Sequence, residues 1–253
     1  MPVVTNQSVR IHYEVVGDGP PLVLHHGLFS NLWDWDEFGY VDALKPSRRL
    51  ILIDARGHGD SDKPHDPAAY DLALRVGDVT AVLDELDVDR TDYFGFSMGG
   101  WIGLGLAKYA PERLGALILL GAHPYAESMQ PFRSLIPTEP GALDAMLRMV
   151  FGRYMTPTLE ARLAKNEPQA LLALTQDCAS MAEVLPTLTQ PCLLLCGDAD
   201  PRLTQMQACA EALEDAAFVT LPNCDHLASF ARSDLVLPVV TGFLAEIEDE
   251  SDG

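Results

Sequence analysis

Residues 91–101 read TDYFGFSMGGW, a stretch that joins a short apolar run to a glycine-rich segment. The first four residues predict the end of a buried strand, and residues 100–108 predict a helix. Between them, Ser97 is the centre of a Gly-x-Ser-x-Gly turn bounded by Gly95 and Gly99. Only residues without side-chain bulk fit beside a turn this sharp, and the turn would hold the serine hydroxyl clear of the backbone. The stretch therefore predicts a reactive serine on a strand–turn–helix unit.

Short continuous apolar runs recur along the chain and predict strands that are buried on both faces. They cover residues 22–25, 50–54, 117–120, 192–196 and 218–221, and an alternating run at 10–16 predicts an edge strand. Helical patterns lie between them, at roughly 69–87, 98–110, 203–214 and 234–248. Because strand and helix alternate, we predict an α/β fold with a mostly parallel, doubly wound sheet.

One long segment breaks this alternation. Residues 124–186 contain no strand-like run, but they contain helical stretches such as 142–151 and 159–163. We predict that 124–186 form a helical cap, inserted between the two parts of an α/β core at 1–123 and 187–253.

The composition narrows the choice of partners. The chain has 253 residues, 48% of them hydrophobic, and a formal net charge of −20 from 37 acidic and 17 basic residues. Nucleic acids and anionic membranes attract basic surfaces, so we expect neither as a partner. No run reaches the roughly 18 apolar residues of a membrane span, and residues 1–7 do not resemble a secretory signal, which predicts a cytoplasmic protein.

The cysteines and histidines give no sign of a metal. The cysteines are five, an odd number without zinc-type spacing: Cys178, Cys192, Cys196, Cys209 and Cys224. Two of them lie in the predicted strand at 192–196, where a reduced thiol acts as a small apolar side chain. Since no set of His, Asp and Glu has recognisable ligand spacing either, we predict no metal and no cofactor.

A serine hydroxyl attacks a carbonyl only if a base removes its proton, and the base is usually a histidine oriented by a carboxylate. Asp198 and Asp200 follow the next-to-last predicted strand, and His226 follows the last one. Functional groups in open parallel sheets gather at the carboxyl ends of strands, so these side chains are expected close to Ser97. The order Ser, Asp, His is the one expected for this architecture.

Together these features resemble the α/β-hydrolase family over essentially the whole chain. The matching features are the His26-Gly27 turn, the turn at 54–61, the Ser97 turn, the turn at 197–200 and His226. The chain is most similar to the branch of small bacterial esterases, lactonases and cofactor-free haloperoxidases, which carries a helical cap where 124–186 falls. The resemblance implies an α/β-hydrolase fold with a helical cap insertion.

The resemblance also implies that Ser97, Asp200 and His226 form a catalytic triad. The family's acid most often lies three residues after the glycine of its turn, which selects Asp200 and leaves Asp198 as the alternative. One departure is Asp225, where the family usually has glycine before the histidine. The haloalkane dehalogenase and epoxide hydrolase branches use an aspartate nucleophile, so Ser97 argues against both.

An acyl-transfer site also needs hydrogen-bond donors for the oxyanion that develops on the substrate. We expect one from the backbone N–H of Met98 and the other from the backbone N–H of Leu28, in a loop that His26 orders. An apolar substrate pocket is predicted beside them, although each candidate side chain has packing of the cap onto the core as its alternative role. The candidates are Phe29, Trp33, His123, Met146, Met149 and Phe151.

These expectations favour hydrolysis of small to medium carboxylic esters through an acyl-enzyme. A lactone, including an enol-lactone, is the next candidate substrate, and a carbon–carbon bond hydrolase would use the same triad. An alternative of a different class is a hydrolase-fold ligand sensor with little turnover. The expected partner is a small-molecule ester or lactone.

Overall fold

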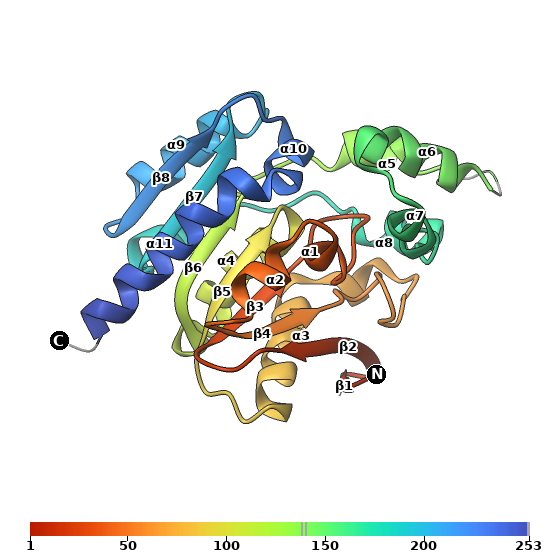
Figure 1. Cartoon of the computed structure of the whole chain (residues 1–253). Coiled ribbons are helices and arrows are strands. Elements are labelled where there is room, and N and C mark those ends of the chain that lie inside the picture. The colour runs from red at the N-terminus through yellow and green to blue at the C-terminus, as the bar shows by residue number, and fades with distance from the viewer. Residues whose placement is uncertain (138, 140, 252–253) are drawn as a thin grey trace.

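The computed structural model describes residues 1–137, 139 and 141–251, and within them one sheet of eight strands forms the centre of the molecule (Figure 1). The strands are β1 (Val3–Asn6), β2 (Val9–Val16), β3 (Pro21–His25), β4 (Arg49–Ile53), β5 (Thr91–Phe96), β6 (Leu114–Leu120), β7 (Cys192–Gly197) and β8 (Ala216–Leu221). Their order across the sheet is β1-β2-β4-β3-β5-β6-β7-β8. β2 pairs antiparallel with β1 and β4, and the other neighbours pair parallel. The predicted mostly parallel α/β sheet is confirmed.

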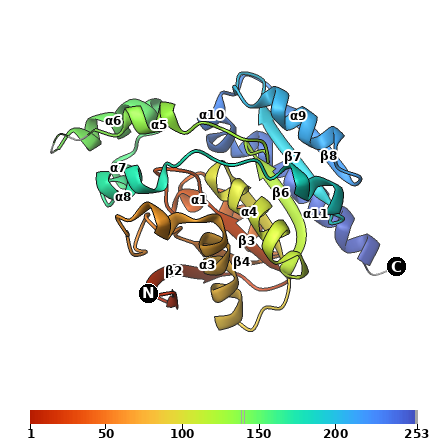
Figure 2. The ribbon, with the colours of Figure 1, turned by 180° about the vertical axis from the view of Figure 1, so that it is seen from behind.

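Helices cover both faces of this sheet (Figures 1 and 2). One face carries α1 (Asp34–Glu37), α2 (Tyr40–Leu44), α10 (His226–Ala231) and α11 (Ser233–Ser251), and the other carries α3 (Leu72–Glu85), α4 (Met98–Tyr109) and α9 (Leu203–Glu211). Short 3₁₀ helices are η1 (Pro67–Tyr70), η2 (Pro111–Arg113), η3 (Gly152–Tyr154) and η4 (Ala182–Thr187). No helix in the described ranges combines the length and the apolarity needed to cross a membrane.

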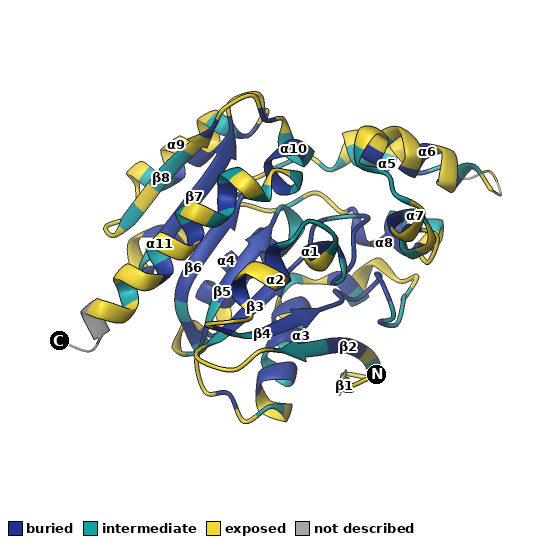
Figure 3. Ribbon diagram, viewed as in Figure 1, coloured by how far each residue is buried: buried dark blue, intermediate teal, exposed yellow. Residues whose placement is uncertain are grey.

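The continuous apolar runs at 22–25, 50–54, 117–120 and 192–196 form strands that are buried on both faces (Figure 3). For the run at 218–221 this prediction is wrong: it lies in β8, the edge strand of the sheet, where Thr220 is exposed. In β3, Val23 belongs to the apolar cluster of α3 and α4, whereas Leu22 and Leu24 belong to the cluster of α1, α2 and α11. All three side chains are fully buried. The alternation of faces along the strand therefore requires an apolar residue at every position.

The expected edge strand at 10–16 is not at the edge. β1 pairs outside it, with Val3 opposite His12, so that β2 is an inner strand. The hairpin turn between the two strands consists of Gln7 and Ser8, with φ of 44° and 71°. Glycine or asparagine usually supplies positive φ in such a turn, and their absence hid the hairpin from the sequence analysis.

The segment between β6 and β7 holds the helices α5 (Gln130–Leu135), α6 (Ala142–Phe151), α7 (Pro157–Leu163) and α8 (Pro168–Leu174). They gather beyond the α/β layers at one end of the molecule (Figures 1 and 2). Glu127 and Cys178 form an antiparallel bridge between the incoming and outgoing chains of the segment. η4, which follows, packs with the cluster of α3 and α4. The exact division into core and cap stays a prediction.

Candidate active site

Ser97 occupies the one-residue turn between β5 and α4, with φ of 52° and ψ of −113°. Non-glycine residues rarely adopt positive φ, so the surrounding structure must hold this conformation. The flanking glycines are required by close approach. A Cβ at Gly95 would lie 2.4 Å from the backbone of α4, and one at Gly99 would lie 2.0 Å from the carbonyl oxygen of His25. The turn thus depends on the two glycines that the motif contains.

The serine lies at the end of a chain of hydrogen bonds. The Oγ of Ser97 is 2.9 Å from Nε2 of His226, and Nδ1 of His226 is 2.6 Å from Oδ2 of Asp200. In the consistent arrangement, the hydroxyl donates to Nε2 and the Nδ1–H donates to the carboxylate. The ring of His226 also stacks on Phe96 with centroids 5.0 Å apart. The hydrogen bonds at its two nitrogens and the contact of its ring with Phe96 together fix the orientation of the His226 side chain.

The two candidate acids have different surroundings. Oδ1 of Asp200 accepts a hydrogen bond from the backbone N–H of Arg202 at 2.9 Å. Burial raises the pKa of Asp200, but the hydrogen bonds and charges of His226 and Arg202 outweigh this, so the pKa lies below its ordinary value. The carboxylate of Asp198 accepts instead from the backbone N–H groups of Asn223 and Cys224. Asp198 ties the loop after β7 to the loop after β8, and Asp200 is the acid that contacts the histidine.

Asp225 has a structural position that explains why an aspartate fits before the histidine. Its Oδ1 accepts a hydrogen bond from the backbone N–H of Ala228 at 2.7 Å and caps the N-terminus of α10. Its other oxygen lies 3.6 Å from the guanidinium of Arg153 in the cap.

The backbone N–H groups of Leu28 and Met98 donate no hydrogen bond within the described residues, and both residues line the same cavity as Ser97. The loop of Leu28 is fixed through its neighbour Phe29, which has φ of 69°. The N–H of Phe29 donates to Nε2 of His58 at 3.3 Å, and its carbonyl accepts from the side chain of Asn166 at 2.7 Å. Two donors are thus left free beside the serine.

His26 and His58 are both buried beneath this loop. His26 bonds the carbonyl of Gly27 through Nδ1 and the N–H of Ala55 through Nε2, which fixes the tautomer with hydrogen on Nδ1. Burial lowers the pKa of both histidines, so they are neutral at neutral pH. Both serve as hydrogen-bonding residues of the loop, as expected for His26.

A cavity of about 460 Å³ opens at Ser97. It runs between α3, α4 and the outgoing chain of the cap, and its wall includes Trp101, His123, Phe132, Arg75 and Arg202. Burial lowers the pKa of His123, and within the part of the chain that the structure describes its Nδ1 has no hydrogen-bond partner. The cavity is mixed in character, with apolar walls and several charged side chains.

Of the six side chains predicted for the pocket, only His123 lines this cavity. Phe29, Met146 and Phe151 belong to an apolar cluster between the predicted cap and the core, which also contains Tyr70. Trp33 packs against the guanidinium of Arg162, and 65% of Met149 is exposed. The apolar face of α6 is buried with residues of α7, α8 and the loop of Phe29 rather than along the cavity at Ser97. This packing is the alternative role expected for these side chains, and a substrate-pocket role for the five residues stays a prediction.

Sequence reasoning missed the charged groups around the serine. The guanidinium of Arg202 pairs with Glu127 at 2.7 Å, and its Nη1 lies 3.4 Å from Nδ1 of His226. The pair joins the loop that carries Asp200 to the first residues of the cap. No local signal distinguishes these residues, because the chain brings together positions 127 and 202 only in the fold.

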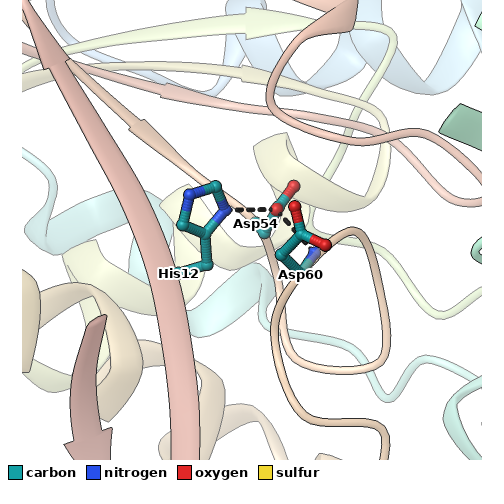
Figure 4. A group of neighbouring side chains, drawn as sticks. All are labelled: His12, Asp54 and Asp60. Carbon is teal, nitrogen blue, oxygen red and sulfur yellow. Dashed lines mark hydrogen bonds and ion pairs between the residues drawn. The ribbon is translucent and has the colours of Figure 1, made fainter. Parts of the chain in front are cut away.

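One group of side chains has a metal-like arrangement: His12, Asp54 and Asp60 (Figure 4). Its donor atoms are already engaged. Nδ1 of His12 bonds Asp54 at 2.7 Å, and Asp54 also accepts the backbone N–H groups of Leu32 and Asp60. The carboxylate of Asp60 binds Lys165. These contacts describe a hydrogen-bonded turn that fits the loop at 54–61, and the expectation of no metal stays a prediction.

The comparisons with known proteins give the family of the chain. The family described as the alpha/beta hydrolase fold matches residues 20–164. The chain belongs to this family. A 3-oxoadipate enol-lactonase of Acinetobacter baylyi is 28% identical over 79% of this chain and 79% of its own.

Two solved structures resemble the whole chain. The enol-lactonase of Burkholderia xenovorans LB400 has a TM-score of 0.84 and 25% identity and covers 96% of this chain and 100% of its own. The esterase RhEst1 of Rhodococcus sp. ECU1013 has a TM-score of 0.82 and 25% identity and covers 97% of this chain and 98% of its own. The protein is thus a hydrolase of this fold, with esterase-like and lactonase-like relatives.

Proposed function

We propose that the protein is a serine hydrolase that cleaves small to medium carboxylic esters through an acyl-enzyme. The observation that carries the proposal is the chain of hydrogen bonds from Ser97 through His226 to Asp200, with contacts of 2.9 and 2.6 Å. These are the distances at which a base takes the proton of an attacking hydroxyl.

In the proposed first step, Nε2 of His226 takes the proton of Ser97 while Oγ attacks the ester carbonyl. The oxyanion that forms from the carbonyl oxygen accepts hydrogen bonds from the backbone N–H groups of Leu28 and Met98. The buried carboxylate of Asp200 stabilises the imidazolium that forms. When the tetrahedral intermediate collapses, His226 gives its proton to the leaving alcohol.

In the second step, water takes the place of the alcohol. His226 removes a proton from the water as the water oxygen attacks the acyl carbonyl. The bond from the carbonyl carbon to Oγ of Ser97 then breaks, and His226 returns its proton to Oγ. The acid product and the starting state of the triad result. A lactone follows the same steps, except that the alcohol stays attached to the acyl group. The enol-lactonases among the relatives favour lactones as the second candidate substrate.

The test is the time course of 4-nitrophenol release from 4-nitrophenyl butyrate, followed by hydrolysis of dihydrocoumarin as a lactone. An esterase gives many turnovers per molecule, and Ser97→Ala reduces the rate to background. Release of one equivalent followed by no turnover would indicate the ligand sensor instead. Turnover that survives Ser97→Ala would contradict the proposal.

A further inference from the structure

Arg75 is a buried cation beside the substrate cavity. It lies on α3, is 7% exposed, and is part of the cavity wall together with Ser97 and Trp101. Its Nε donates to the carbonyl of Tyr70 at 2.9 Å, and its Nη2 donates to the carbonyl of Leu174 at 3.0 Å. These two bonds orient the guanidinium, but neither brings a negative charge to it.

Within the described residues, no carboxylate lies within ion-pair distance of Arg75. The acid one turn further along α3, Asp78, is bound by Arg56 through two hydrogen bonds of 2.6 and 2.5 Å. The other cations on the cavity wall are paired: Arg202 with Glu127, and Lys108 with Glu183. The guanidinium lies over the rings of Tyr70 and Trp101, with Cζ 5.5 and 5.7 Å from their centres, but these neighbours carry no negative charge. Burying a cation without an anionic partner is unfavourable, so this arrangement favours an anionic ligand.

One donor of Arg75 is unused. Among the described residues, the hydrogen bonds of its side chain come from Nε and Nη2 and none comes from Nη1. Arg75 is one of the residues that line the cavity at Ser97. Burial lowers the pKa of Arg75 to about 10, and the group therefore stays protonated at neutral pH.

Trp101 connects the surroundings of Arg75 with those of the serine. Trp101 follows Ser97 by one helical turn, since its N–H bonds the carbonyl of Ser97, and this turn rises about 5–6 Å. The carbon Cζ of Arg75 lies 5.7 Å from the centre of the Trp101 ring. A ligand that reaches from the serine to the guanidinium therefore passes the indole and needs several atoms between its two ends.

We propose that Arg75 binds an ionised carboxylate of the substrate, so that the preferred substrates are esters or lactones of dicarboxylic acids. In such a substrate, one carboxyl group is esterified and reacts at Ser97, and the other is free and accepts from Nη1 of Arg75. A short carbon chain beside Trp101 joins them. The proposal rests on the proposed function and names the substrate class of the same site.

The test compares two matched esters, monoethyl adipate and the ethyl ester of adipic acid monoamide, which differ only in the charge of the far end. Ethanol release gives kcat/KM for each. A charge-assisted hydrogen bond predicts that the wild type prefers the anion by about 10- to 100-fold. Arg75→Gln abolishes this preference, which is measured as the ratio of the two kcat/KM values within the variant. Lys108→Gln, which removes a paired cation of the same wall, keeps the preference.

The proposal is overturned if the wild type hydrolyses the anionic ester and the amide ester with the same kcat/KM. The same equality must hold for the succinate and glutarate homologues, and the amide esters must react. This result does not depend on the folding of any variant. If no ester reacts, the proposed function fails. The proposed carboxylate site at Arg75 is then tested separately by isothermal titration calorimetry with adipate. The proposal is supported if the wild type binds adipate at least tenfold more tightly than Arg75→Gln does, or at least tenfold more tightly than it binds adipamide. Equal affinities in both comparisons overturn it.

Discussion

At the scale of single residues, the site depends on opposing effects at Asp200. Desolvation favours the neutral carboxyl, and the contacts with His226 and Arg202 favour the carboxylate, with the charged form prevailing. Asp198 lies two positions earlier, and its carboxylate binds two backbone N–H groups. The two aspartates thus have separate roles, one beside the histidine and one between two loops.

Replacement of each acid by its amide separates these roles. We expect Asp200→Asn to lower kcat for an aryl ester by about 10²- to 10⁴-fold, because an amide cannot stabilise the imidazolium of His226. Asp198→Asn keeps an oxygen acceptor for the loop and should change kcat by less than about threefold. Steady-state kinetics of both proteins checks this. A near-normal Asp200→Asn together with a crippled Asp198→Asn would mean that the acid is misassigned.

The sequence predicted part of this site and not the rest. The serine turn and the histidine follow from strand ends and spacing, because both groups lie in local motifs. The choice between Asp198 and Asp200 needed the family resemblance, since both follow the same strand. Arg75 and Arg202 carry no signal in the sequence, because their partners are up to about a hundred positions away in the chain.

At the scale of helices and strands, an amphipathic pattern in the cap predicts that a helix face is buried but not which elements cover it. The spacing of Leu143, Met146 and Leu147 predicts a buried face on α6, and these residues are buried. The pattern does not say what covers the face, and α7 and α8 do so. Strands buried on both faces were predicted from their runs of apolar residues, whereas β1 was missed because its pairing depends on an unusual turn.

Phe132 on α5 lines the cavity, so we expect the cap to influence acyl length through α5 rather than through α6. Phe132→Ala should enlarge the cavity and raise the ratio of kcat/KM for octanoate over butyrate esters by about tenfold or more. Met149→Trp is the matched control, because this exposed side chain should leave the ratio unchanged. A ratio that responds to Met149→Trp but not to Phe132→Ala would place the acyl pocket beneath α6 after all.

At the scale of the whole molecule, buried titratable groups link folding to pH. Burial lowers the pKa of His25, His26 and His58, so each is neutral in the fold and takes up a proton on unfolding below about pH 6.5. Burial raises the pKa of Asp34 to about 7, so the fold holds a proton there that the unfolded chain releases. Since three histidines of this set gain a proton on unfolding and only Asp34 releases one, these four groups together take up protons when the protein unfolds below about pH 6.5.

The contribution of these groups to the free energy of unfolding should consequently fall as the pH falls through this range. Urea denaturation at pH 6.0, 5.5 and 5.0 measures this slope. Asp34→Asn should steepen the slope by about 1.4 kcal/mol per pH unit, since it removes the opposing group. A free energy of unfolding that is constant or rises toward pH 5 would contradict the neutral state of these histidines.

The central claim is that Ser97 is the nucleophile and that His226 activates it. The most direct measurement is the mass of the protein and of its peptides after reaction with a fluorophosphonate. We predict one label per chain, on the peptide that contains Ser97, with labelling abolished in Ser97→Ala and slowed by about 10³-fold or more in His226→Ala. A label on a different serine, or a His226→Ala protein that reacts as fast as the wild type, would contradict the account.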